Sequence, residues 1–211
     1  MKLFRRSMIV LMVIVVLVSC VSTKEKTVVL DHKGASFGLP EPAWLLAFVG
    51  GAGNPSVEAL PEYRNQICFV LSEIDANRDF AIGMVDSANV SAAVARVIAT
   101  TVMTNAKAMS EAERGDDQVS AAFSNTADAM SNASYTGLRK AADWWRIVEN
   151  KSTKERRAEA YVLYTIDSKL MSDQIARNLA NIMENNRELS AAEREIYRDL
   201  IAHIRTSGFK Q

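Results

Sequence analysis

Two apolar runs joined by a charged segment place the strongest limit on how this chain can fold. Residues 137–149 include two adjacent tryptophans, residues 159–166 read "EAYVLYTI", and the polar segment "NKSTKERR" lies between them. Runs rich in aromatic and β-branched residues, separated by a polar loop, are typical of a β-hairpin. The second run is apolar on both faces. Together the two runs predict an antiparallel pair of strands.

Other segments predict one more long strand and four helices. Residues 66–74 are β-branched and aromatic enough for a buried strand, and residues 27–30 could form a short edge strand. Four segments carry apolar residues at helical spacing: one over 87–113, one from Asp116 or Asp117 to Met130, one from Asp167 or Ser168 to Met183, and one from the capping box Ser190–Glu193 to a stop at Gly208.

This order of elements predicts an α+β domain: a small, mainly antiparallel sheet of three to four strands, covered on one side by about four helices. With 211 residues and 48% hydrophobic content, the chain has material for one ordinary domain. We assign that domain to residues 60–211. Glycine and proline interrupt residues 20–59, so these predict an extended tether and entry segment, with Trp44 packed onto the domain as a lid.

The first 19 residues have the organisation of an export signal. Three basic residues precede position 7, and Met8–Val18 is an uninterrupted apolar run. A membrane-spanning helix needs roughly 20 apolar residues, so this run of about 11 is too short to cross a bilayer. The run ends in the tetrapeptide "LVSC", in which the small residue Ser19 directly precedes Cys20.

This ending resembles the lipobox of bacterial lipoproteins. In that family the cysteine thiol receives diacylglycerol, a signal peptidase cuts before the cysteine, and the new amino group is usually acylated, for instance with palmitate. The resemblance implies Sec export and a mature chain held to a membrane by lipid on Cys20. Val21, in place of an aspartate that retains lipoproteins in the inner membrane, favours the outer membrane, with the body in the periplasm. The alternatives are an ordinary secretory signal with a chance cysteine and an uncleaved signal anchor.

Charge and cysteine content exclude further classes of function. The 25 basic and 25 acidic residues cancel, so no field of one sign would attract nucleic acid. Once Cys20 carries lipid, Cys68 is the one remaining thiol and no intramolecular disulfide can form. Cys68 lies within the apolar strand 66–74, where we expect a buried cysteine that acts as a small hydrophobe; a nucleophile or redox thiol is the alternative.

The sequence offers no catalytic, cofactor or metal signature. Its two histidines, His32 and His203, lie far apart without metal-ligand spacing, and both are expected to be solvated. No nucleophile elbow, Ser-x-x-Lys motif or phosphate loop is present, because "VGGAG" at 49–53 lacks the lysine and hydroxyl of a P-loop. We therefore expect a protein that is not an enzyme and uses no cofactor.

The adjacent pair Trp144 and Trp145 is the best candidate for a partner-binding site. Neighbouring side chains on a strand point to opposite faces, so one indole is expected in the core and the other toward solvent, a helix or a partner. The plainer alternative is that both are covered. Two functions follow: a non-enzymatic structural or protein-binding module with an envelope protein as partner, or a carrier or receptor for a small apolar ligand, held between sheet and helices by Phe123, Met130, Trp145 and Tyr161.

Three longer stretches resemble a known family. These are the stretch "YRNQICFVLSEIDANRDFAIGMVDSANVSAAVARVIATTV", the later "ASYTGLRKAADWWRI" and above all "RAEAYVLYTIDSKLMSDQIARNL". They resemble uncharacterised spirochaete outer-membrane lipoproteins, which are similar in turn to the twenty-kilodalton lipoproteins of other bacteria. The resemblance covers roughly residues 40–183. It implies an envelope lipoprotein with a compact α+β body and no established catalytic residues.

Overall fold

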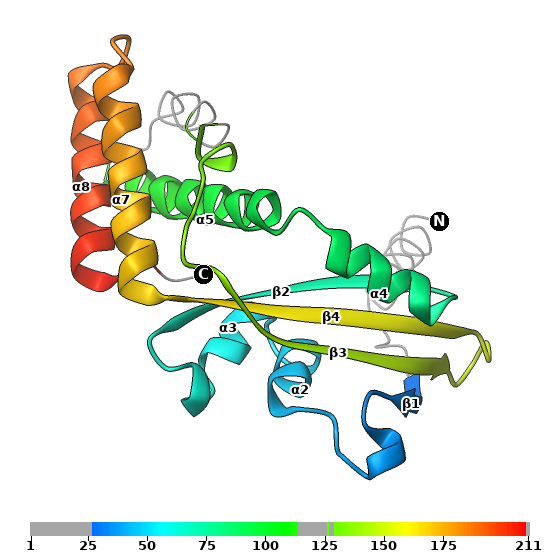
Figure 1. Cartoon of the computed structure of the whole chain (residues 1–211). Helices are drawn as coiled ribbons and strands as arrows, with labels where there is room; N and C mark the ends of the chain where they lie inside the picture. Colours follow the sequence, from blue (N-terminus) through cyan, green and yellow to red (C-terminus); the bar gives the residue numbers. More distant parts are fainter. Residues whose placement is uncertain (1–26, 114–125, 127–128, 210–211) are drawn as a thin grey trace, which may run out of the picture.

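The computed structural model describes residues 27–113, 126 and 129–209. It shows an α+β fold in which helices pack on both faces of a four-stranded antiparallel sheet (Figure 1). The strands are β1 (Thr27–His32), β2 (Gln66–Asp75), β3 (Arg139–Asn150) and β4 (Arg156–Asp167). Their order across the sheet is β1-β3-β4-β2, so the predicted hairpin forms the centre and β1 and β2 form the edges. The predicted fold class is confirmed.

The hairpin strands extend further toward the turn than the sequence predicted. Residues 156 and 157, expected in the loop, belong to β4, and the connection spans only residues 151–155. Asn150 explains the shorter turn, because its Oδ1 accepts hydrogen bonds from the backbone N–H groups of Ser152 (2.8 Å) and Thr153 (3.2 Å). The resulting register places Arg146 opposite Glu159.

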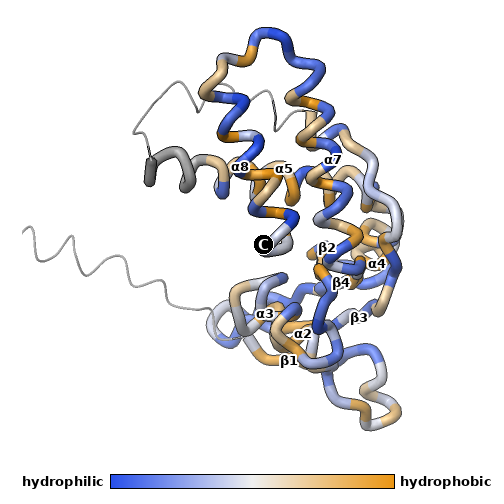
Figure 2. Tube along the Cα trace, turned by 90° about the vertical axis from the view of Figure 1, so that its left-hand side faces the viewer, coloured by the Kyte–Doolittle hydropathy of each residue, from blue (hydrophilic) through white to orange (hydrophobic). Residues whose placement is uncertain are grey.

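Four helices lie on one side of the sheet, two along its face and two upright at one end of it (Figure 1). They are α4 (Arg78–Ser87), α5 (Val90–Glu113), α7 (Ser168–Asn185) and α8 (Ala191–Ser207). Ile67 and Phe69 of β2 and Ile166 of β4 join the apolar side chains of α5, α7 and α8 in one cluster. Hydrophobic and hydrophilic residues alternate along α7 and α8, as expected of amphipathic helices (Figure 2).

The opposite face is covered as well, so the prediction of helices on one side only was wrong. Two short helices, α2 (Ala43–Gly50) and α3 (Asn54–Glu58), lie there (Figure 1). Trp44, Leu45 and Val57 pack against Cys68, Tyr161 and Leu163 of the sheet. The physical reason is the composition of β4, which buries apolar side chains at successive positions and therefore needs cover on both faces.

These two helices lie in the segment that the sequence predicted to be extended. Its prolines and glycines bound the helices instead of preventing them: Pro42 is the N-cap of α2, and Gly51 follows its last residue. The apolar run between them fits a short helix whose inner side faces the sheet. The expected packing of Trp44 is confirmed, because only 5% of this residue is exposed.

Other helix boundaries were predicted with mixed success. The predicted helix 87–113 begins at Val90, and α4 precedes it as a separate helix that the sequence pattern did not predict. Asn77 caps α4 by accepting hydrogen bonds from two backbone N–H groups of its first turn. The helix predicted to reach Met130 lies mostly outside the described residues. The start of α7 and the capping box of α8 are confirmed.

Among the described residues, no single helix is long and apolar enough to cross a bilayer. The consecutive helices α4 and α5 meet that criterion only together, as a pair bent by 72°. Apolar side chains of both helices, including Val85, Val94 and Ile98, are buried within the body.

Candidate functional site

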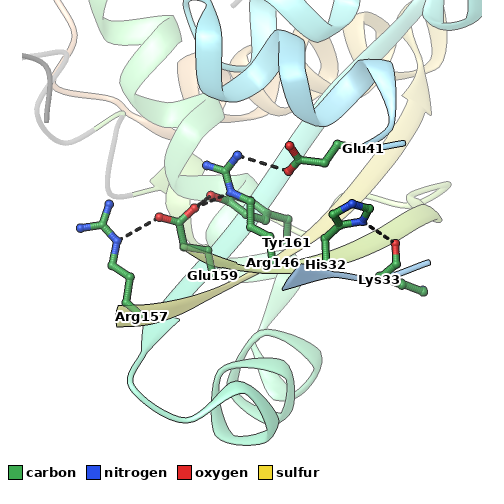
Figure 3. A network of polar contacts seen from close by, with 7 residues as sticks. All are labelled: His32, Lys33, Glu41, Arg146, Arg157, Glu159 and Tyr161. Carbon is green, nitrogen blue, oxygen red and sulfur yellow. Dashed lines mark hydrogen bonds and ion pairs between the residues drawn. The ribbon is translucent and has the colours of Figure 1, made fainter. Parts of the chain in front are cut away.

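A buried network of charged side chains lies on the side of the sheet that carries α2 and α3 (Figure 3). Its centre is the pair Arg146 of β3 and Glu159 of β4, which are 8% and 3% exposed. The register of the hairpin places them opposite one another, and their side chains point to the same face. Glu41, which precedes α2, reaches the network from the α2 side of the sheet, while Arg157 and Tyr161 join it from β4.

Glu159 is the shared acceptor of this network. Its Oε2 accepts hydrogen bonds from Arg146 Nε (2.7 Å) and from the hydroxyl of Tyr161 (2.6 Å). Its Oε1 accepts one from Arg157 Nε (3.0 Å). Arg146 also contacts Glu41, with 3.3 Å between Nη1 and Oε1, and lies over the ring of Tyr161 at 5.8 Å from its centroid. Both carboxylate oxygens of Glu159 are therefore engaged.

The electrostatics favour a permanently charged pair. Burial alone would raise the pKa of Glu159, but hydrogen bonds from Tyr161 and Arg146 outweigh it and bring the pKa below its usual value. Burial alone would lower the pKa of Arg146, but its hydrogen bond to Glu159 and nearby negative charge raise it. Burial and the neighbouring carboxylate raise the pKa of Tyr161. A carboxylate held as an anion in this way is poorly suited to exchange protons near neutral pH.

A cavity of about 300 Å³ opens at the hairpin end of the sheet. It is lined by residues of all four strands and of the hairpin turn: Thr27, Ile74, Asp75, Ala76, Val148, Asn150, Thr153, Glu155, Arg156 and Arg157. This lining includes two arginines and two carboxylates, so its formal charges cancel.

The two predicted partner-binding residues lie on opposite faces of β3, and both are half-buried. Trp144 packs with the α2 and α3 side and stacks on His32, with ring centroids 5.7 Å apart. Its Nε1 is buried and has no hydrogen-bond partner in the described part of the chain. On the other face, the guanidinium of Arg78 lies 4.8 Å from the centroid of Trp145. Side chains of this protein thus cover part of each indole.

The two histidines and the free thiol occupy different environments. His203 is exposed as expected, whereas His32 is half-buried because it stacks on Trp144. Cys68 is fully buried, and burial together with the nearby carboxylate of Glu58 raises the pKa of its thiol to about 12. A thiol with this pKa stays protonated at neutral pH and is a weak nucleophile. Within the described residues no three His, Cys, Asp or Glu side chains are grouped so that they could hold a metal ion.

Helix α3 covers part of one edge of the sheet with its polar side chains. The Oε1 of Glu58 accepts a hydrogen bond from the backbone N–H of Cys68 (2.9 Å), and the Oδ1 of Asn54 accepts one from Val70 (3.0 Å). Both donors belong to the edge strand β2. Covering an edge in this way prevents it from pairing with another chain. The other edge strand, β1, pairs on its inner side with β3, and no strand of the described chain pairs with its outer side.

The residues proposed to line an apolar pocket do not meet. Met130 is fully buried in the cluster of α5, α7 and α8, whereas Tyr161 is buried on the opposite side of the sheet. Trp145 faces α4, and Phe123 lies outside the described residues. One ligand between sheet and helices could therefore not contact Met130 and Tyr161 together.

No protein-family model matches this sequence, and no curated protein or solved structure matches it either. The resemblance to spirochaete lipoproteins therefore stays a prediction from the quoted stretches alone. The site itself has to be interpreted from its own geometry.

Proposed function

We propose that this chain is a lipid-anchored bacterial envelope protein that acts as a non-enzymatic structural or protein-binding module. The observation that carries the proposal is the ending "LVSC" of the N-terminal apolar run, which supplies the thiol of Cys20 for lipid attachment. The described body begins at Thr27, only seven residues later, with an edge strand. Export by Sec, cleavage before Cys20 and retention in the outer membrane with a periplasmic body complete the proposal.

The chemistry of the body supports a non-enzymatic role. The buried charges of Arg146 and Glu159 satisfy one another, which is the pattern of a structural ion pair. The thiol of Cys68 is buried and protonated at neutral pH. These groups are thus used for folding.

The outer side of β1 is the surface we propose for an envelope partner. An edge strand presents unpaired backbone donors and acceptors, and an extended peptide can add to it as a further strand. Leu30, which is 45% exposed, lies at the irregularity in the pairing between β1 and β3. On the opposite edge, α3 already engages the backbone N–H groups of Cys68 and Val70, so that part of β2 is not open to a further strand.

Site-specific photo-crosslinking in cells tests this proposal. A photoreactive amino acid at Leu30 is expected to capture a reproducible envelope protein, identified by mass spectrometry. The same amino acid at Arg187, an exposed residue of the α7–α8 turn, serves as the control. The adduct should disappear when Cys20→Ala removes the anchor. Capture of nothing but a second copy of the chain would contradict the adaptor role.

A further inference from the structure

The segment between β1 and α2 exposes the most solvent-accessible large apolar side chain of the described residues, Phe37, together with Leu39. Phe37 is 84% exposed and Leu39 is 55% exposed. The intervening short 3-10 helix, η1 (Ala35–Phe37), is framed by Gly34 and Gly38, whose φ angles of 88° and 67° favour glycine. This tight turn leaves the phenyl ring of Phe37 exposed.

The same segment carries no charge at its tip. Residues 34–40 read "GASFGLP", and the nearest cation, Lys33, is paired with Asp143 on β3. The turn lies at the bottom of Figure 1, whereas the α7–α8 turn lies at the top, and Figure 2 shows the same arrangement. The body thus has one uncharged apolar tip at the end remote from its helical hairpin.

The proposed anchor brings this tip close to the bilayer. A chain advances at most about 3.6 Å per residue, so the seven steps from Cys20 to Thr27 span no more than about 25 Å. Strand β1 rises about 3.3 Å per residue, which places its end at His32 roughly 17 Å from Thr27. The apolar turn follows directly after β1. The apolar turn is therefore closer to Thr27, where the tether enters the body, than the fully extended tether is long.

We infer that the turn at residues 34–39 is a second membrane contact, which inserts Phe37 and Leu39 among the lipids of the leaflet that holds Cys20. The inference rests on the proposed lipid anchor. A short anchor keeps the body at the surface, where a single apolar turn gains affinity that it would lack in solution. Apolar side chains of such segments enter about 5–10 Å into the boundary between headgroups and acyl chains. The contact would fix the orientation of the body and hold β1 beside the membrane.

A fluorescent label at position 37 tests the contact in the full lipidated chain. Cys68 is fully buried and Cys20 carries its thioether, so Phe37→Cys supplies the accessible thiol for an environment-sensitive dye. Arg187→Cys is the matched control at the remote turn, and Leu39→Cys is a second probe. The proteins are placed in nanodiscs of phosphatidylethanolamine and phosphatidylglycerol, at one copy per disc, with and without spin-labelled phospholipid.

The inference predicts blue-shifted emission and strong quenching by spin-labelled lipid at positions 37 and 39, with neither effect at position 187. Equal, weak quenching at all three positions in disc-bound protein would overturn the membrane contact while leaving the anchor intact. A blue shift that needs several copies per disc and shows no lipid quenching would identify a second copy as the occupant and would also overturn it. Labelling of the unsubstituted chain at Cys20 would instead contradict the anchor, so the two failures are distinguishable.

Discussion

The two faces of the sheet are stabilised by different means. The face on the side of α4, α5, α7 and α8 is packed almost entirely with apolar side chains, among them the fully buried Ile166 of β4. The face beneath α2 and α3 joins a smaller apolar cluster around Leu163 to the buried pair of Arg146 and Glu159. An apolar core tolerates substitutions that keep its total volume, whereas a buried ion pair is strongly destabilised when one partner is removed. The two faces should therefore respond differently to mutation.

Removing one partner of the ion pair should have the largest effect. Glu159→Ala leaves the guanidinium of Arg146 buried without its main acceptor, and breaking a buried pair in this way costs about 3–5 kcal/mol. We expect that loss in the free energy of unfolding, measured with urea and tryptophan fluorescence. Replacing both partners by apolar residues, Arg146→Met with Glu159→Leu, should cost clearly less than Glu159→Ala alone. A double variant as unstable as the single one would show that the charges are not coupled.

Truncating an apolar core side chain on either face should reduce the free energy of unfolding nearly as much as breaking the ion pair. Leu163 and Ile166 lie on the same strand, are both fully buried and point to opposite faces. Each change to alanine is expected to reduce the free energy of unfolding by about 2–5 kcal/mol, because it leaves a cavity. If Leu163→Ala reduced the free energy of unfolding by less than about 1 kcal/mol, α2 and α3 would not cover this face in solution. The comparison of two covered faces would then not hold.

Acid should weaken the face that carries the ion pair. The pKa of Glu159 is lowered in the folded protein from an ordinary value of 4.5, so its carboxylate contributes stability above that pH. This contribution is lost as the pH falls below about 4.5 through the folded pKa. The wild-type chain should therefore lose stability more steeply than Glu159→Gln over this range. Parallel curves of unfolding free energy against pH for the two proteins would contradict the assigned role.

The capping box of α8 should make a smaller contribution. Ser190 Oγ accepts a hydrogen bond from the N–H of Glu193 (3.3 Å), and Ser190 N–H donates to the Glu193 carboxylate (2.6 Å). Ser190→Ala removes the first bond and is expected to cost about 1 kcal/mol. Ser190→Asp, which keeps an acceptor, should retain most of the stability. An equal loss in both variants would mean that the hydroxyl does not act as a cap.

The smallest effect on stability is expected in the exposed apolar turn at residues 34–39. Phe37→Ser should change the free energy of unfolding by less than about 0.5 kcal/mol, because the side chain makes few contacts within the body. Denaturation in the absence of lipid provides the measurement. A loss above 1 kcal/mol would show that Phe37 supports folding, and membrane contact would then not be needed to explain its exposure.

The sequence predicted those elements whose signals are local. The hairpin strands, the start of α7 and the capping box of α8 follow from patterns within one segment, and all were observed. Helix α4 was missed although Asn77, a favourable N-cap residue, marks its start. The helices α2 and α3 were missed because prolines and glycines were interpreted as signs of an extended chain. In such short helices, tertiary packing of Trp44 and Leu45 outweighs local propensity.

The charged network depends on which residues of β3 and β4 lie opposite one another. The hydrophobic pattern of the sequence did not predict this register. With the predicted eight-residue loop, Arg146 would lie opposite Tyr161 instead of Glu159. The five-residue connection set by Asn150 shifts the pairing by two residues and brings the opposite charges together. The available signal was that Arg146 and Glu159, residues of opposite charge, lie within the two predicted strands.

Intact-mass spectrometry of the chain purified from its bacterial membrane tests the central claim most directly. We expect a mature chain that begins at Cys20, lacks residues 1–19 and carries the added mass of diacylglycerol and an amide-linked acyl chain. The Cys20→Ser variant should lack that added mass. An unacylated wild-type chain, whether cleaved elsewhere or retaining its first 19 residues, would contradict the lipid anchor and the membrane contact that depends on it.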